Sequence, residues 1–163
     1  MQIVLGSRGD YTVRAVLFLT RHDGVRRRRE ISEAMDIPDT FLPQILGALV
    51  RAGVARSVAG RRGGYELARP AGSITLREVV EIAEGPIESA KCLLRGGPCY
   101  WNEKCALHDA WSAAQSALVT QLATTTFAQL ALVDWALEAH STVDPTSPRR
   151  PHAPRVHRPV GPD

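Results

Sequence analysis

The sequence predicts a mainly α-helical chain that carries one small β-hairpin. Apolar residues recur at helical spacing in several segments, and a glycine-rich basic stretch, "AGRRGG", separates two short runs that favour strands. The 163 residues suffice for one domain with a hydrophobic core, or for a small domain with an extension, but not for two full-sized domains.

Two helices are predicted before the first proline of the chain. Residues 7–22 form the first helix, which opens with Ser7-x-x-Asp10, a pattern typical of a capping box. The polar stretch "HDGVRRRR" ends it, and the apolar residues of "REISEAMDI" then follow the spacing of a short second helix. Pro38 interrupts the helical pattern after that.

A third helix is predicted for the stretch "TFLPQILGALVRAG". Pro43 fits only in the first turn of a helix, because its missing N–H is not needed there, so the helix should begin near Asp39 or Thr40. Gly53 stands where a glycine commonly ends a helix. The hairpin follows, and two helices joined by a tight turn with a hairpin behind them form a winged helix-turn-helix.

Three further helices are predicted after the hairpin. A short one, "LREVVEIAEG", begins with the capping pattern Thr75-x-x-Glu78. A long alanine-rich helix runs from about residue 103 to 122, and its apolar stripe calls for a partner helix, most simply from a second copy of the chain. A last helix begins at the capping pattern "TFAQ" and continues to about residue 140.

The chain is therefore expected to divide into four parts. These are a winged helix-turn-helix domain at residues 1–86, a cysteine-bearing loop at 87–108, dimerisation helices at 103–140 and a tail at 141–163. The tail combines many prolines with arginines and almost no apolar residues, so it is expected to be disordered.

The arginines indicate where a nucleic acid would bind. The net charge is only +3, but basic residues concentrate between residues 51 and 69. The candidate DNA contacts are Thr40, Gln44, Arg51, Arg56, Arg61 and Arg62. Those on the third helix would face the major groove and its phosphates, while Arg61 and Arg62 at the hairpin tip would enter a minor groove.

A run of four arginines, residues 26–29, precedes the second helix. Its position before the helix-turn-helix would let these arginines contact DNA phosphates. A solvated run of charge explains the same pattern equally well, so both interpretations stay open.

The chain is expected to act in the cytoplasm. Its N-terminus lacks a basic region followed by an apolar block and a small-residue cleavage site, and no run of about 18 apolar residues is present to cross a membrane. Thiols stay reduced in that compartment, so a disulfide framework is not expected. Enzymatic activity is not expected either, because the sequence offers no nucleophile with a base, no phosphate loop and no paired carboxylates beside the cysteines.

The cysteines Cys92, Cys99 and Cys105 all lie in the stretch "KCLLRGGPCYWNEKCALH", and His108 follows the last of them by three residues. Four such donors in so short a span can converge on one metal centre. Structural zinc sites favour paired cysteines two to four residues apart, and no such pair is present. An iron–sulfur cluster is therefore favoured over zinc or unligated thiols.

Several stretches resemble the winged-helix transcription regulators typified by IscR and NsrR, the BadM or Rrf2 type. They are "SRGDYTVRA", "IPDTFLPQIL", "GRRGGYELARP", "ITLREVVEIAEGP" and the cysteine loop leading into the long helix, and the resemblance covers roughly residues 1–138. It implies a homodimer that binds a palindromic operator, with a cluster that switches or tunes that binding. The predicted function is a transcription regulator, most simply a repressor, that senses redox stress, nitric oxide or iron–sulfur status.

The fourth cluster ligand is open between two residues. His108 matches the IscR-like pattern and favours a [2Fe-2S] cluster, whereas Asp10 matches the position where NsrR-like proteins supply a carboxylate from the other subunit to a [4Fe-4S] cluster. We slightly favour His108, because it is local and needs no particular dimer geometry. The sequence departs from the IscR pattern by one extra residue between the first two cysteines and by Asp10 in place of a basic residue.

Two alternative functions also stay open. One is a regulator of the same fold whose cysteines bind zinc or nothing. The other belongs to a different class, an iron–sulfur electron carrier or enzyme.

Overall fold

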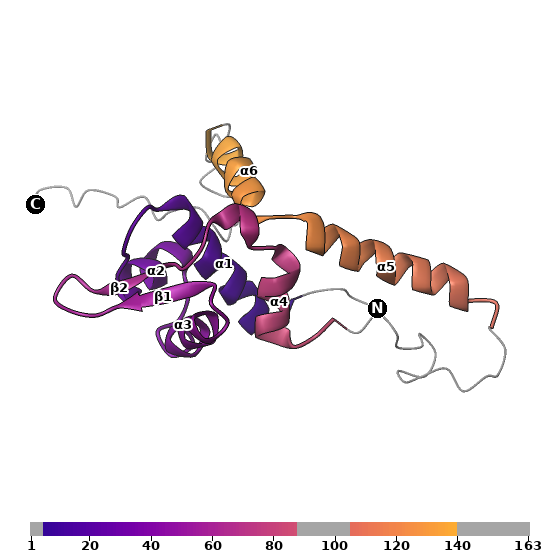
Figure 1. Cartoon of the computed structure of the whole chain (residues 1–163), viewed down its shortest axis with the longest axis horizontal. Coiled ribbons are helices and arrows are strands. Elements are labelled where there is room, and N and C mark those ends of the chain that lie inside the picture. Colours follow the sequence, from indigo (N-terminus) through magenta and orange to yellow (C-terminus); the bar gives the residue numbers. More distant parts are fainter. Residues whose placement is uncertain (1–4, 88–104, 140–163) are drawn as a thin grey trace, which may run out of the picture.

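The computed structural model describes residues 5–87 and 105–139 (Figure 1). The predicted tail and two of the three cysteines, Cys92 and Cys99, lie outside these residues. The elements are α1 (Ser7–Arg21), α2 (Arg28–Met35), α3 (Leu42–Arg51), β1 (Ala55–Val58), β2 (Gly64–Leu67), a short 3₁₀ helix η1 (Ala71–Ser73), α4 (Leu76–Glu84), α5 (His108–Thr124) and α6 (Phe127–Ala139). The predicted mainly helical chain with one β-hairpin is thus confirmed for the described part.

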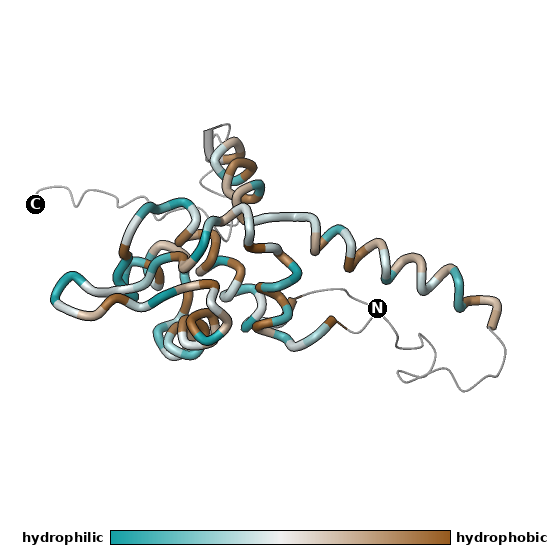
Figure 2. Tube along the Cα trace, in the orientation of Figure 1, coloured by the Kyte–Doolittle hydropathy of each residue, from teal (hydrophilic) through white to brown (hydrophobic). Residues whose placement is uncertain are grey.

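The core forms around α1, which packs against α2, α3, α4 and α6. Apolar side chains from these helices are buried together, and Figure 2 shows hydrophobic residues, in brown, along the helices of this part of the chain. Ala15, Val16, Ile31, Leu42, Leu46, Leu49, Ile74, Val79 and Phe127 are among the fully buried members. Burial of this apolar surface is the main favourable contribution to the folding free energy, and it fixes the position of α2 relative to α3.

The third helix begins two residues later than the sequence indicates. The N–H groups of Phe41 and Leu42 both donate to the Pro38 carbonyl, at 3.0 and 3.3 Å, so the residues before α3 form a separate turn. Pro43 lies in the first turn of the helix, as predicted. Thr40 therefore lies in the turn that precedes the helix and not on the helix itself.

The predicted capping box at the start of α1 is wrong. Gly6 occupies the N-cap, and Ser7 is already the first helical residue. The carboxylate of Asp10 instead accepts a hydrogen bond from Arg14 Nε at 3.0 Å.

A carboxylate from the end of α4 caps the first turn of α1 instead of the predicted capping box. Gly9 donates its N–H to Glu84 Oε1 at 2.8 Å, and a negative charge at this end of a helix is favourable. A Cβ on Gly9 would lie 2.6 Å from the same oxygen, so the approach requires glycine. The end of α4 is thereby fastened to the turn that carries Asp10.

Four other predicted helix ends are confirmed, those at Thr75, Thr126, Gly53 and Gly85. Glu78 donates its N–H to Thr75 Oγ1 at 3.2 Å, and the start of α6 has the reciprocal bonds of a capping box. Gly53 and Gly85, with φ of 69° and 90°, end α3 and α4 in conformations that disfavour other residues.

Helix α5 extends away from the rest of the chain (Figure 1). It begins at His108, about five residues later than predicted, because the chain first makes a turn in which His108 donates its N–H to the Cys105 carbonyl at 3.0 Å. No residue of α5 is buried by the described part of the chain.

Helix α6 returns to the winged helix-turn-helix. Phe127 donates its N–H to the Ile74 carbonyl at 3.0 Å, and its ring is fully buried. An ion pair of 2.7 Å between Arg21 and Asp134 also joins α1 to α6. The described helices include none that is long and apolar enough to cross a membrane.

Candidate nucleic-acid interface and metal-ligand segment

Helix α3 has one buried face and one exposed face. Leu42, Ile45, Leu46 and Leu49 are buried in the core. Gln44 and Arg51 are exposed, and so is Thr40 in the preceding turn. These three candidate residues, two on α3 and one in the turn before it, are therefore accessible to a ligand. A buried face that seats the helix leaves these polar side chains free to enter a DNA groove.

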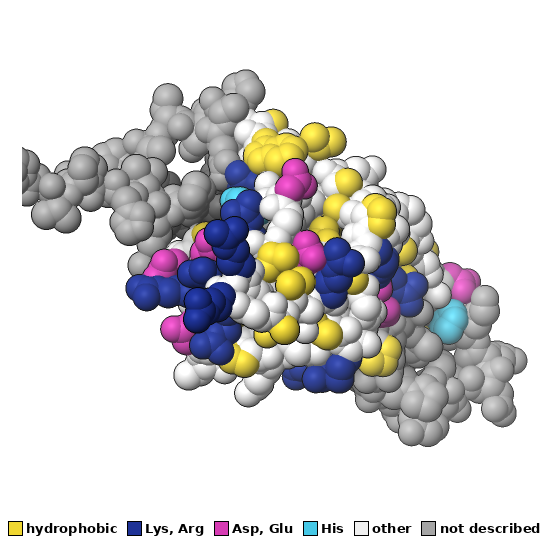
Figure 3. Space-filling model, turned by 60° about the vertical axis from the view of Figure 1, so that its left-hand side comes forward, with side chains coloured by type: hydrophobic (Ala, Val, Ile, Leu, Met, Phe, Trp, Pro, Cys, Tyr) yellow, Lys and Arg dark blue, Asp and Glu magenta, His cyan; other side chains and the backbone are white. Residues whose placement is uncertain are grey.

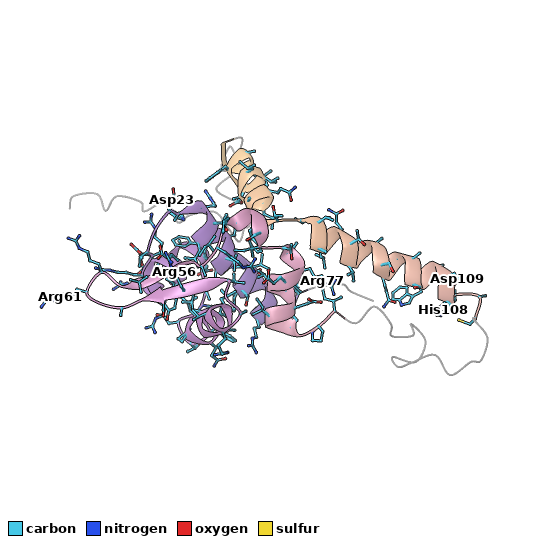
Figure 4. The ribbon with its side chains drawn as sticks, viewed as in Figure 1. Asp23, Arg56, Arg61, Arg77, His108 and Asp109 are labelled. Carbon is cyan, nitrogen blue, oxygen red and sulfur yellow. The ribbon has the colours of Figure 1, made fainter. Side chains whose placement is uncertain are left out.

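The hairpin presents two arginines at its tip. Arg61 and Arg62 are both exposed, and Figure 4 shows Arg61 extending from the tip of the hairpin away from the body. Arg56 is placed differently, because it lies opposite Glu66 in the strand register and its Nε is 2.8 Å from Glu66 Oε1. Its charge is thus largely matched within the protein, which makes it a weaker candidate for DNA phosphates than the tip arginines.

A third, single-residue strand joins the arginine run to the hairpin. Arg26 and Tyr65 exchange two backbone hydrogen bonds of 2.8 Å each. A Cβ on Gly64 would lie 2.2 Å from the Arg26 carbonyl oxygen, so the close approach requires glycine. Sequence reasoning missed this pairing, although the doubled glycine at the end of "AGRRGG" was a signal that another backbone comes near.

Basic side chains gather on the side of the molecule that carries the hairpin. Figure 3 shows a dense group of dark blue side chains there, with only a few acidic ones between them. Arg29 is one arginine whose charge is already met, since its Nε is 2.6 Å from Glu33 Oε1. That hydrogen bond and the charge of Glu33 raise the pKa of Arg29, which keeps it protonated.

The predicted metal ligands are only partly described. Cys105 is a free, half-buried thiol just before α5, and the half-buried His108 is the first residue of that helix. Figure 4 shows His108 beside Asp109 at the end of α5 that is remote from the hairpin. Within residues 5–87 and 105–139, no three potential ligands lie close enough to hold a metal ion, so Asp10 is not brought to Cys105 and His108 there.

Asp10 is instead the start of a chain of contacts toward α3. Its partner Arg14 also donates from Nη1 to the Met35 carbonyl at 3.3 Å. The guanidinium carbon of Arg14 lies 5.6 Å from the ring centre of Tyr11, which meets Phe41 edge-on at 5.5 Å. Phe41 is the N-cap of α3, so a change at Asp10 has a contact route to the exposed helix.

The helix-turn-helix, its basic hairpin and the exposed face of α3 define a winged helix-turn-helix protein. The model of the Rrf2 family, described as an iron-dependent transcriptional regulator, matches residues 5–132. The chain therefore belongs to the Rrf2 family of DNA-binding transcription regulators.

Named relatives agree with this assignment. A candidate helix-turn-helix transcriptional regulator of Mycobacterium tuberculosis is 35% identical over 129 residues, which is 78% of this chain and 80% of that protein. The helix-turn-helix regulator IscR of Klebsiella pneumoniae is 35% identical over 109 residues, 66% of each chain. These relatives are transcription regulators and not enzymes.

A solved structure agrees at the level of the fold. The oxidized form of CymR from Staphylococcus aureus superposes with a TM-score of 0.64 at 27% identity, covering 79% of this chain and 96% of that chain.

Proposed function

We propose that this chain is a dimeric cytoplasmic repressor that senses redox stress, nitric oxide or iron–sulfur status through an iron–sulfur cluster on Cys92, Cys99 and Cys105. One observation carries the proposal. A segment with three cysteines and a histidine connects α4 to α5 of a winged helix-turn-helix, in a family described as iron-dependent. Thiolates select iron–sulfur clusters or zinc, and the spacing favours the cluster.

The operator would be read by α3 and the hairpin. In this class of proteins the second helix of the motif enters the major groove, where Gln44 and Arg51 would contact base edges and phosphates. Thr40, in the preceding turn, would contact the adjacent backbone. Arg61 and Arg62 would then reach the neighbouring minor groove.

A second copy of the chain is the proposed partner of α5. The helix has 17 residues, none of which is buried by the part of the chain that the structure describes, and its Leu118 is exposed, as is Leu107 just before it. Apolar residues on an exposed helix favour pairing with another helix. A two-fold dimer would set two α3 helices about one turn of DNA apart, roughly 34 Å, and its operator would be palindromic.

A non-cysteine ligand would make the cluster responsive. When bound, the cluster supplies a centre that accepts or loses an electron and reacts with nitric oxide. His108 would hold one iron more weakly than a thiolate does and would remove negative charge, which raises the reduction potential.

The two candidate fourth ligands differ in what they do to α3. Asp10 bonds Arg14 in the structure, so binding iron would cost it that partner and would free Arg14 beside the Met35 carbonyl. His108 lies on α5 and has no such contacts, so its binding would act through the relation between the cysteine loop and the dimer helix. Loss of the cluster would in either case alter the relation between the two α3 helices and thereby operator affinity.

The fourth ligand can be assigned by comparing His108→Ala with Asp10→Ala. Since we favour His108, we expect its loss to shift the visible spectrum and speed cluster loss in air, while Asp10→Ala leaves the spectrum unchanged. Asp109→Ala, one residue along the same helix, is the matched control. The reverse pattern, with only Asp10→Ala altering the spectrum, would assign the carboxylate and refute the histidine.

An anaerobic absorption and Mössbauer spectrum of the protein as isolated tests the proposal most directly. We expect visible absorption and the signal of two irons per chain. Four irons would overturn the preference for His108, and a colourless protein that contains zinc or no metal would overturn the cluster.

A cluster-free regulator is the second candidate function. It is supported by the likeness to CymR, whose structure has been solved in an oxidized form, since a protein of this fold can then exist in more than one oxidation state. The cysteines of the present chain would in that case bind zinc or act as thiols. Iron and sulfide analysis of the anaerobic protein separates the two candidates. An electron carrier or enzyme is disfavoured, because the named relatives are regulators.

A further inference from the structure

The four arginines at residues 26–29 have four different surroundings. Arg26 belongs to the fold, because its backbone pairs with Tyr65 and its half-buried side chain donates from Nη2 to the Asp23 carbonyl at 3.1 Å. A residue held in this way positions its neighbours but has little freedom to reach a ligand. It fixes the start of the run beside the hairpin.

Arg27 braces the hairpin tip. Its Nη2 donates to the Arg61 carbonyl at 3.4 Å, and its backbone N–H donates to Glu30 Oε2 at 2.6 Å. The contact brings the start of α2 next to the tip arginines. Arg29, two residues further along the chain, is paired with Glu33.

Arg28 differs from its three neighbours. It is the first residue of α2, it is exposed, and among the described residues its guanidinium has no hydrogen-bond or ion-pair partner. Long arginine side chains normally point their charge to water or to an anion, and five N–H donors are available here for an anion.

The acidic residues of this surface are already engaged. Glu30 accepts from the Arg27 backbone, Glu33 pairs with Arg29, and Glu66 pairs with Arg56. Within residues 5–87 and 105–139, the guanidinium groups of Arg28, Arg61 and Arg62 therefore pair with no carboxylate. Three guanidinium groups on two elements joined by the Arg27–Arg61 hydrogen bond form a positive surface.

We propose that Arg28 contacts a DNA phosphate and that it forms, with Arg61 and Arg62, one continuous phosphate-binding strip beside α3. The inference rests on the proposed binding of an operator by α3 and the hairpin, and it extends that interface to the start of α2. The guanidinium suits phosphate, because its planar fork of donors matches two phosphate oxygens. The run of arginines is then neither wholly solvated nor wholly DNA-binding: one of its four members makes the contact.

Operator affinity as a function of salt tests the strip. Each phosphate contact contributes about 0.9 to the slope of log affinity against log salt, so Arg28→Gln in a dimer should lower that slope by about 1.8 and weaken binding at low salt. Arg28→Lys keeps the charge and should largely restore the slope. The measurement is fluorescence anisotropy of the full-length protein, purified anaerobically, on operator duplex at five or so salt concentrations.

The control removes a neighbouring charge pair. The double variant Arg29→Ala/Glu33→Ala leaves the net charge unchanged and should keep the wild-type slope. Unchanged slopes for Arg28→Gln, with a lowered slope for Arg61→Ala/Arg62→Ala, would overturn the role of Arg28 and leave the proposed operator face standing. Unchanged slopes for both would overturn the face itself. An equal loss for Arg28→Gln and for the Arg29/Glu33 pair would also refute a specific contact at Arg28.

Discussion

Replacing Cys99 by alanine is expected to abolish the visible absorption of the anaerobically purified protein. A cluster needs several thiolates at once, so the loss of one in the middle of the segment removes the site and does not merely weaken it. The iron content should fall to the background of the preparation. The visible absorption spectrum, together with iron and sulfide analysis, measures the effect.

The same variant also tests whether the cluster controls DNA binding. Operator affinity of Cys99→Ala should equal that of wild-type protein from which the cluster has been removed, and both should differ from the cluster-loaded form at fixed salt. Tyr100→Phe, at the next residue, keeps the cysteines and should remain coloured. A Cys99→Ala protein with an undiminished coloured spectrum would exclude Cys99 as a ligand, and equal affinity of the loaded and cluster-free forms for every operator would disprove the coupling.

Removing Arg61 and Arg62 together is expected to have the largest effect on DNA binding. A dimer loses four guanidinium groups, so the salt slope should fall by about 3.6 if each group releases one counterion. Affinity should fall most at low salt, because the lost contacts are electrostatic. Titration of specific and random duplexes over a range of salt measures both effects.

Arg77→Ala is the matched control for the hairpin variant. Arg77 lies on α4, away from the hairpin tip, and pairs with Glu81 at 3.0 Å (Figure 4). Its removal takes a positive charge from a surface that the proposed operator does not touch, so the slope should stay at the wild-type value. A hairpin variant whose slope matches that of wild type would remove the hairpin from the interface.

Periodic and local features of the fold were predictable from the sequence. Apolar spacing located the helices, and the patterns at Thr75 and Thr126 marked true helix starts, because a cap is made by residues three apart. The first helix does begin at Ser7 as predicted, but its cap was predicted wrongly for the converse reason. Its cap is Glu84, which lies 75 residues from Gly9 in the chain and leaves no local signal.

The candidate interface was predictable in residue type but not in pairing. The sequence marks Arg56, Arg61 and Arg62 as equivalent arginines of one hairpin, yet strand register places Glu66 opposite the first of them and nothing opposite the others. Likewise, the single-residue bridge at Arg26 is too short to produce an alternating pattern. Contacts between elements, and not the elements themselves, decide which charges are available to DNA.

The contact between Glu84 and the start of α1 makes three positions in the sequence depend on one another. A Cβ on Gly6 or Gly9 would lie 3.0 or 2.6 Å from Glu84 Oε1, so a side chain at either glycine would collide with the carboxylate. A side chain at position 9 should therefore displace the flexible Glu84 carboxylate and break its bond to the residue 9 N–H, and it should cost less once Glu84 has been shortened, which is non-additivity between distant positions. Positions 6, 9 and 84 are therefore expected to change together during evolution, although they lie far apart in the sequence.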